Sequence, residues 1–321
     1  MSKIGRRIYL LVIIASLFAA SCASTEDDGP NGDSRAISFT PNTGSRAAVN
    51  DASDMDAFSV WGWYGKDAQI TNNVFDGITV SKSGNAWTYT GGSRYWLPGY
   101  TYNFHAVYPA ELNGTSVTTD GNFTINNFDA SFTGEQAVDL MTASRLAMSG
   151  DAAEQVAFTF SHELVKVDVI IQAMLSVKVT IHEVKIHGIS TSGTFTLNTA
   201  NATRAWDVQP AVNSSNTPYS NTTPTELDGD GTTNQTNAFS ALLLIPQSIN
   251  NAKLSITYQR EGETASTTQE IALNQQTSTW NAGNSYRYTL LFETDNITFS
   301  GFTVEAWNTR YSGGDINITG I

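Results

Sequence analysis

Apolar and polar side chains alternate in short runs along most of this chain, which is the pattern of β-strands with one buried face. In Tyr100–Tyr108 every even-numbered residue is apolar or aromatic, and Pro109 ends the run. Other alternating runs span residues 156–162, 165–171, 177–181, 254–258, 286–290 and 302–306. Residues 135–147 are the best candidate for a helix, but the prevailing period of two predicts an all-β fold built from β-sandwiches.

The composition is typical of a secreted β-protein. Charged residues make up 15% of the 321 residues, and the formal net charge is -13. No cluster of Lys and Arg could offset phosphate charge, so the sequence argues against nucleic acid as a partner.

The first residues have the features of a secretory signal peptide, which we assign to residues 1–21. The apolar run Ile8–Phe18 follows three basic residues and is shorter than the roughly 20 residues that cross a bilayer. The small residues Ala19–Ser21 precede Cys22, the only cysteine, which cannot form an internal disulfide. We therefore predict lipid attachment at Cys22. The alternative is an ordinary signal peptide in which the cysteine is incidental.

The length favours two domains after the signal peptide. Residues 22–35 are polar and rich in Gly, Pro and Asp, as in a flexible tether. The composition shifts near residue 150, so we place an N-terminal β-sandwich at 36–155 and a C-terminal one at 156–321.

The histidines offer little support for catalysis or metal binding. His182 and His187 are five residues apart, so on a regular strand they face opposite sides unless the strand bulges between them. His105 lies opposite the aromatic face of its run, and we expect His162 to border a core with a satisfied hydrogen bond. With no recognisable nucleophile or phosphate-binding motif, we expect no enzyme activity, no catalytic residue, no metal and no cofactor.

Aromatic residues are dense in the first predicted domain. Exposed rings could stack on sugars, but alternating aromatic residues more often pack inside a sandwich, and we favour packing. The residues concerned are Trp61, Trp63, Tyr64, Trp96, Tyr100 and Tyr102.

Several segments in order resemble the fimbrillin (Mfa-like, type V pilin) family of Bacteroidetes. The most specific is Phe158–Val169, which in such proteins opens the second domain. The others are Ile37–Phe39 with Ser45–Ala47, Ala106–Pro109, Asp139–Ala143, Trp280–Leu290 and Val304–Trp307. The acidic cluster Glu26–Asp28 is similar to the surface-export signal of Bacteroidetes lipoproteins.

This resemblance implies two transthyretin-like β-sandwich domains in tandem and export to the outer membrane with a lipid anchor. It implies a structural subunit of an adhesive fimbria, whose partners are other subunits, an arginine-specific maturation protease and an unknown adhesion ligand. In stalk members of the family the protease removes the first strand, and a C-terminal strand of the neighbouring subunit fills the groove.

Applied to this chain, the resemblance predicts cleavage between Arg46 and Ala47, with Arg35–Ala36 as the second choice. The donor strand would lie within residues 302–321, where the alternating candidates are Phe302, Val304, Ile316 and Ile318. Two alternatives stay open: a tip or anchor subunit of the same fold, and an unpolymerised surface lipoprotein that binds glycan through the first-domain aromatic residues.

Overall fold

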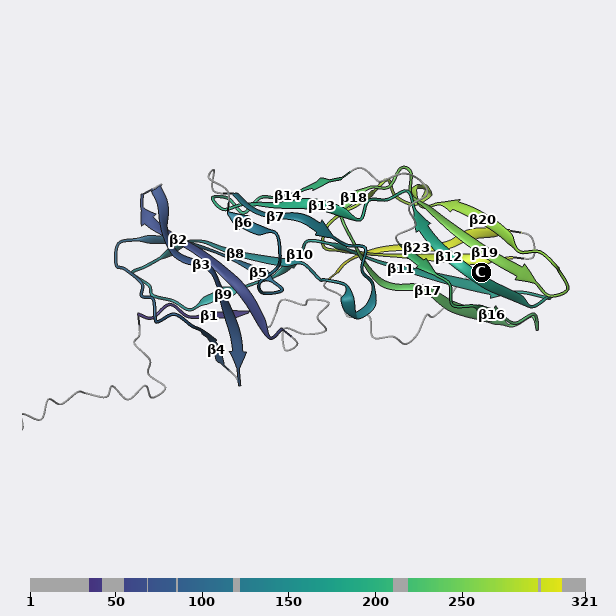
Figure 1. The fold of residues 1–321 in the computed structure, drawn as a ribbon, viewed down its shortest axis with the longest axis horizontal. Coiled ribbons are helices and arrows are strands. Elements are labelled where there is room, and N and C mark those ends of the chain that lie inside the picture. Colours follow the sequence, from purple (N-terminus) through teal and green to yellow (C-terminus); the bar gives the residue numbers. More distant parts are fainter. Residues whose placement is uncertain are drawn as a thin grey trace, which may run out of the picture. The chain divides into compact units, whose positions relative to one another are not determined.

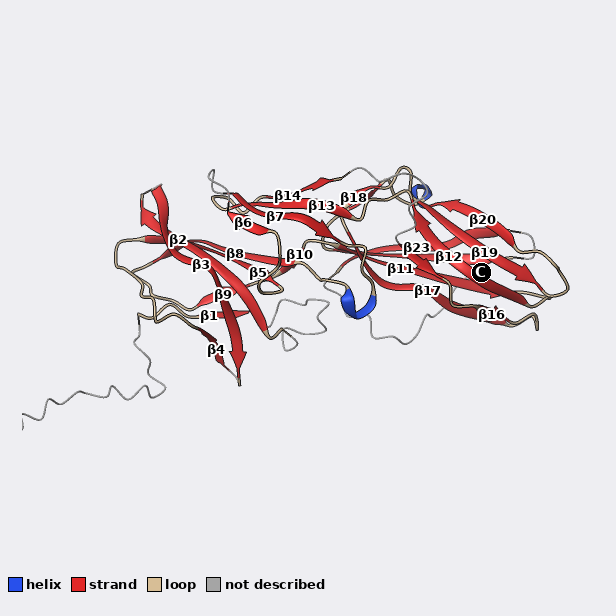
Figure 2. Cartoon of the chain, viewed as in Figure 1, coloured by secondary structure: helices blue, strands red, loops and turns tan. Residues whose placement is uncertain are grey.

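The computed structural model describes residues 35–41, 55–67, 69–84, 86–117, 122–209, 219–293 and 296–307. Almost all regular structure in these ranges is β-strand (Figures 1 and 2), which confirms the all-β prediction. The helical turns among them are η1 (Gly134–Gln136) and η2 (Leu273–Gln275), both single 3-10 turns. No helical segment of the described chain has the length and apolar character needed to cross a bilayer.

A six-stranded sheet forms the centre of the first half of the chain. Its strand order is β10 (Ser161–His162), β8 (Met141–Ser149), β5 (Thr101–Tyr108), β2 (Ala57–Lys66), β3 (Gln69–Ser83) and β4 (Ala86–Tyr89). All of its neighbouring strands are antiparallel.

Both faces of this sheet are covered. Phe58 and Val60 of β2 belong to one buried cluster, whereas Trp61 of the same strand belongs to another. The first cluster is closed by the parallel pair β1 (Phe39–Pro41) and β9 (Val156–Phe158). The second is closed by the sheet β14 (Arg204–Val208), β13 (Ser192–Asn198), β7 (Asn122–Asp129) and β6 (Thr115–Val117).

The second half of the chain forms a β-sandwich from two further sheets. One has the order β17 (Thr233–Leu244), β11 (Val165–Met174), β22 (Asn284–Phe292) and β23 (Ile297–Ala306). The other has the order β15 (Tyr219–Asn221), β12 (Val179–His187), β19 (Lys253–Arg260) and β20 (Thr267–Ala272), with β16 (Thr225–Leu227) also paired to β12. A short pair, β18 (Gln247–Ser248) and β21 (Thr279–Trp280), completes the strands described.

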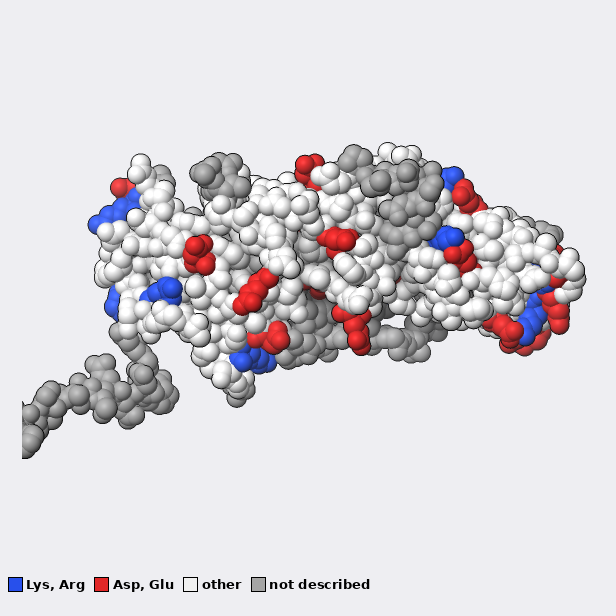
Figure 3. All heavy atoms as spheres, viewed as in Figure 1, with Lys and Arg blue, Asp and Glu red and all other residues white. Residues whose placement is uncertain are grey.

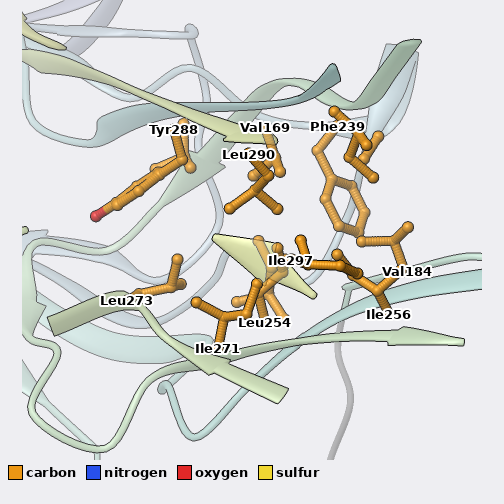
Figure 4. Packing of buried hydrophobic residues seen from close by; sticks show 14 of the residues in the cluster. Val169, Val184, Phe239, Leu254, Ile256, Ile271, Leu273, Tyr288, Leu290 and Ile297 are labelled. Atoms are coloured by element: carbon orange, nitrogen blue, oxygen red, sulfur yellow. The ribbon is translucent and has the colours of Figure 1, made fainter. Parts of the chain in front are cut away.

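Apolar side chains from both of these sheets meet in one core, as alternating strands require. In Figure 4, Val169 and Leu290 from one sheet lie toward Ile256 and Ile271 from the other. The predicted division at residue 155 stays a prediction. The sheet that contains β7 and β13 draws strands from both sides of that residue.

The prediction of a helix at residues 135–147 is wrong. Only one 3-10 turn occurs there, and the chain then enters β8, which pairs with β5 from Tyr108↔Met141 to Thr101↔Ser149. Met141 and Ala143 are fully buried in the core beneath that sheet. Tertiary pairing thus outweighs the weak local helix preference of this segment.

Candidate functional site

The N-terminal segment 35–41 is built into the core of the first half. Its side chains alternate, as a half-buried strand requires. Ile37 and Phe39 are each 1% exposed, whereas Ser38 and Thr40 are half-buried on the opposite side. The segment therefore contributes two large apolar side chains to a core whose other members come from much later in the chain.

Phe39 lies at the centre of a cluster of aromatic rings. Its ring centroid is 4.9 Å from that of Phe75, 5.7 Å from Phe104, 5.8 Å from Phe158 and 5.9 Å from Tyr89. Three of these pairs are edge-on and the Phe158 pair is stacked, which are the favoured arrangements of aromatic rings. Removal of Phe39 would leave a cavity bordered by four rings.

One edge of the segment is paired with residues 94–96 in antiparallel fashion. The Ile37 amide donates to the Arg94 carbonyl at 2.7 Å, and the Trp96 amide donates to the Arg35 carbonyl at 2.9 Å. The Tyr89 hydroxyl adds a side-chain link, because it donates to the Ile37 carbonyl at 2.9 Å and accepts from the Arg94 amide at 3.2 Å.

The other edge is paired with β9 in parallel, with Phe39 opposite Val156. The Val156 amide donates to the Ser38 carbonyl at 2.9 Å. Among the described strands, β1 is the only ladder partner of β9. Loss of residues 35–41 would therefore open an apolar groove flanked by two unpaired backbone edges, a surface that binds an added strand.

The predicted processing residues are only partly within the described chain. Cys22, Arg46 and Ala47 lie outside the described residues. Arg35, the second-choice cleavage point, is half-buried and takes part in the antiparallel pairing described above.

Of the four predicted donor-strand residues, two lie within the described chain and two lie outside it. Phe302 and Val304 lie on β23, which pairs with β22 from Asn284↔Ala306 to Phe292↔Ile297. Phe302 packs against the core of the second half, and Val304 is 44% exposed. Ile316 and Ile318 lie outside the described residues.

The first-domain aromatic residues mostly point inward. Trp61, Trp96 and Tyr102 are at most 9% exposed, and Trp63 is half-buried 6.0 Å from the His105 ring. Tyr64 and Tyr100 are half-buried as well. The buried rings are not available to stack on a sugar.

The histidines have individual structural partners. His162 is 5% exposed, its Nδ1 lies 2.9 Å from Asp139 Oδ1, and its ring stacks on Trp307 at 3.8 Å. The expected satisfied hydrogen bond of His162 is confirmed. His105 is fully buried between Ser144 and the Thr199 carbonyl, and burial lowers the pKa of its imidazole to about 4.

The strand that carries His182 and His187 does bulge, at residues 181–183. The two rings nevertheless have separate partners: His182 is 3.4 Å from Gln259, and His187 is 3.3 Å from Glu270. Within the ranges that the structure describes, no three His, Cys, Asp or Glu side chains are grouped so as to hold a metal ion.

The face shown in Figure 3 is mostly uncharged. Acidic and basic side chains are scattered over it, and several lie together at the right-hand end of the view. The most distinctive feature of the described residues is the early strand that completes a core built mainly from residues later in the sequence.

The described residues thus define an all-β protein whose first strand fills a groove between two later segments. The profile of the fimbrillin-like family matches residues 45–307, and the chain belongs to this family.

Solved structures share the fold. A fimbrial protein of Bacteroides vulgatus is 16% identical with a TM-score of 0.57, over 85% of this chain and 99% of that one. A candidate cell adhesion protein of Bacteroides uniformis is 21% identical with a TM-score of 0.51, over 85% of this chain and 97% of that one. Among curated proteins, no sequence matches this chain.

Proposed function

We propose that this chain is a structural subunit of an adhesive cell-surface fimbria. It reaches the outer membrane as a lipoprotein acylated at Cys22, is cut by an arginine-specific protease between Arg46 and Ala47, and joins its neighbours by strand exchange. The observation that carries the proposal is the seating of Ile37 and Phe39 in a core that the rest of the chain encloses. Family membership and the fimbrial relative support it.

Removal of the first strand makes exchange favourable. It exposes the Phe39 cavity and leaves backbone groups of β9 and of residues 94–96 without their partners. Unpaired buried backbone groups and exposed apolar surface are both costly, so an incoming strand is stabilised on arrival. Because donor and acceptor are different surfaces, the contact does not close on itself and builds a filament.

We assign the donor role to the chain beyond Trp307, with Ile316 and Ile318 as the side chains that would enter the groove. Phe302 and Val304 are the less suitable candidates because they already pair with β22 in their own sheet. Their release would break the sandwich that holds the second half of the chain together.

The first test is N-terminal sequencing of the protein recovered from the cell surface, together with denaturing gels run without boiling. The Arg46→Ala variant is compared with Arg145→Ala, which removes an exposed arginine from β8. We expect wild type and Arg145→Ala to start at Ala47 and to form a ladder of high mass, and Arg46→Ala to do neither. A start at Cys22 and one monomer band in all three would contradict the stalk role and favour a tip, an anchor or an unpolymerised lipoprotein.

A further inference from the structure

The Arg35 side chain binds the two segments against which its own strand lies. Its Nε and Nη2 donate to the Trp96 carbonyl at 3.2 and 3.0 Å, and Nη2 also donates to the Gly150 carbonyl at 2.7 Å. The Arg35 carbonyl in turn accepts from the Trp96 amide. Both the backbone and the guanidinium of this residue are therefore occupied by hydrogen bonds.

The two acceptor carbonyls are held firmly by their surroundings. Trp96 is 1% exposed, and its ring lies 4.7 Å from the ring of Tyr102. Gly150 donates its amide to the Tyr100 carbonyl at 2.8 Å, and a Cβ added there would lie 2.2 Å from the Leu97 carbonyl oxygen. Only glycine fits such a close approach, so the Trp96 and Gly150 carbonyls form a closely packed receptor for the guanidinium.

We propose that Arg35 is the latch of the first strand: it fastens residues 35–41 in the groove and is thereby withheld from the protease. The inference rests on the proposed function, since it concerns the strand that maturation removes. The sequence suggested Arg35 as a second cleavage point. Here Arg35 has the opposite role, because it retains the strand.

In the seated strand, Arg35 does not present the groups that an arginine-specific protease must bind. An arginine-specific enzyme takes the guanidinium into its own pocket and needs the flanking backbone in an extended, accessible form. At Arg35 the guanidinium is bound to Trp96 and Gly150, and the backbone from the Arg35 carbonyl to the Ile37 amide is paired with residues 94–96. Cleavage after Arg35 thus requires prior release of the strand.

The hydrogen bonds of Arg35 also bear on how long the strand stays in the groove after cleavage. Hydrogen bonds from a charged donor are stronger than neutral ones, and a forked guanidinium holds two acceptors at fixed geometry. After a cut at Arg46 the strand is no longer covalently joined to the body, and the latch slows its departure. Cleavage and opening of the groove become two separate steps.

The first experiment does not depend on cleavage or on polymerisation. Hydrogen exchange of residues 36–40 is measured in the uncut chain 23–321, which contains the whole compact unit that begins at Arg35. In Arg35→Ala we expect exchange about tenfold faster or more. Arg35→Lys should be intermediate, because a lysine can bind one carbonyl but cannot fork. Arg145→Ala, with the same loss of charge on an exposed residue, should match wild type.

The second experiment follows the strand itself. The same proteins are treated with an arginine-specific endoprotease, and the release of the peptide that ends at Arg46 is followed by mass spectrometry. We expect no cut after Arg35 while the wild-type strand is seated, and release from Arg35→Ala at least about tenfold faster than from wild type.

Exchange in Arg35→Ala equal to wild type, or a cut after Arg35 in the seated wild-type strand, would overturn the latch. If neither the wild-type protein nor any variant polymerised, while the exchange rates of residues 36–40 were as expected, the proposed function would be overturned and the latch would stand. The two ideas therefore fail separately.

Discussion

Glu163 and Arg204 form an ion pair in which the carboxylate is 2% exposed, with Arg204 Nε 2.8 Å from Glu163 Oε1. The Thr142 hydroxyl donates to the same oxygen at 2.5 Å, and Trp206 Nε1 donates to the Glu163 carbonyl at 2.9 Å. The cluster joins β14, from the second half of the chain, to the edge of the six-stranded sheet at β8 and β10. Among the described ion pairs, Glu163 is the most deeply buried carboxylate.

This pair predicts a pH dependence of stability. Burial raises the pKa of Glu163 to about 7, although Arg204 and Thr142 oppose the shift. The folded protein therefore binds the proton more tightly than the unfolded chain, so the contribution is fully present below pH 4.5 and is lost as the pH rises through 7. Between pH 4.5 and 8, the free energy of unfolding of wild type, measured with urea, should fall by up to about 3 kcal/mol because of this group.

The control is Glu163→Gln, which keeps an acceptor for Arg204 but cannot titrate. Its free energy of unfolding should change less with pH than that of wild type over the same interval. Parallel pH profiles for the two proteins would contradict the assignment of the effect to Glu163.

A second prediction concerns the groove. Phe39→Ala removes the ring that four others surround, and a buried Phe→Ala change costs about 3–5 kcal/mol. We expect its free energy of unfolding to fall by about that amount, measured by urea unfolding followed through tryptophan fluorescence. Ser38→Ala, on the opposite side of the same strand, should change it by less than about 1 kcal/mol. Equal effects of the two changes would show that the strand does not support the core.

The strands were predictable where one face is buried and the pattern is local. In β22 the even-numbered residues Tyr286, Tyr288 and Leu290 are buried and the residues between them are half-buried, as the alternation predicts. The segment that includes Met141 was misread, because its short apolar spacing fits more than one period and only its pairing with β5 decides between them.

The polar clusters could not be predicted in the same way. Glu163 lies in the short bend between β10 and β11, and its partners Thr142, Arg204 and Trp206 come from other positions in the chain. The receptor for Arg35 likewise depends on carbonyls of Trp96 and Gly150, and any residue type has a carbonyl. Such contacts have no signature in residue type or spacing.

A third prediction concerns the end of β23. Trp307 is 3% exposed and stacks on the ring of His162, whose Nδ1 lies 2.9 Å from Asp139 Oδ1. Trp307→Ala should lower the free energy of unfolding by about 3 kcal/mol or more, since a buried indole is lost. The matched change Val304→Ala, at a residue 44% exposed, should cost less than about 1 kcal/mol. A similar loss of unfolding free energy in the two variants would mean that the stack of Trp307 on His162 does not anchor β23.

The last prediction separates the two sets of donor candidates. Ser285 and Glu305 face each other across β22 and β23, and opposed residues of an antiparallel pair lie within the Cα separation that a disulfide spans. The double variant Ser285→Cys, Glu305→Cys would therefore lock β23 onto β22 under oxidising conditions. The chain that remains after a cut at Arg46 contains no other cysteine, so no competing disulfide can form.

We expect the locked subunit to polymerise as well as wild type, because the proposed donor follows Trp307 and β23 stays in its own sheet. The measurement is the high-mass ladder on unboiled gels with and without reductant, and Ser285→Cys alone is the control for the substitution itself. A ladder that appears only after reduction would assign the donor strand to Phe302 and Val304, since those residues could act only after β23 had left β22.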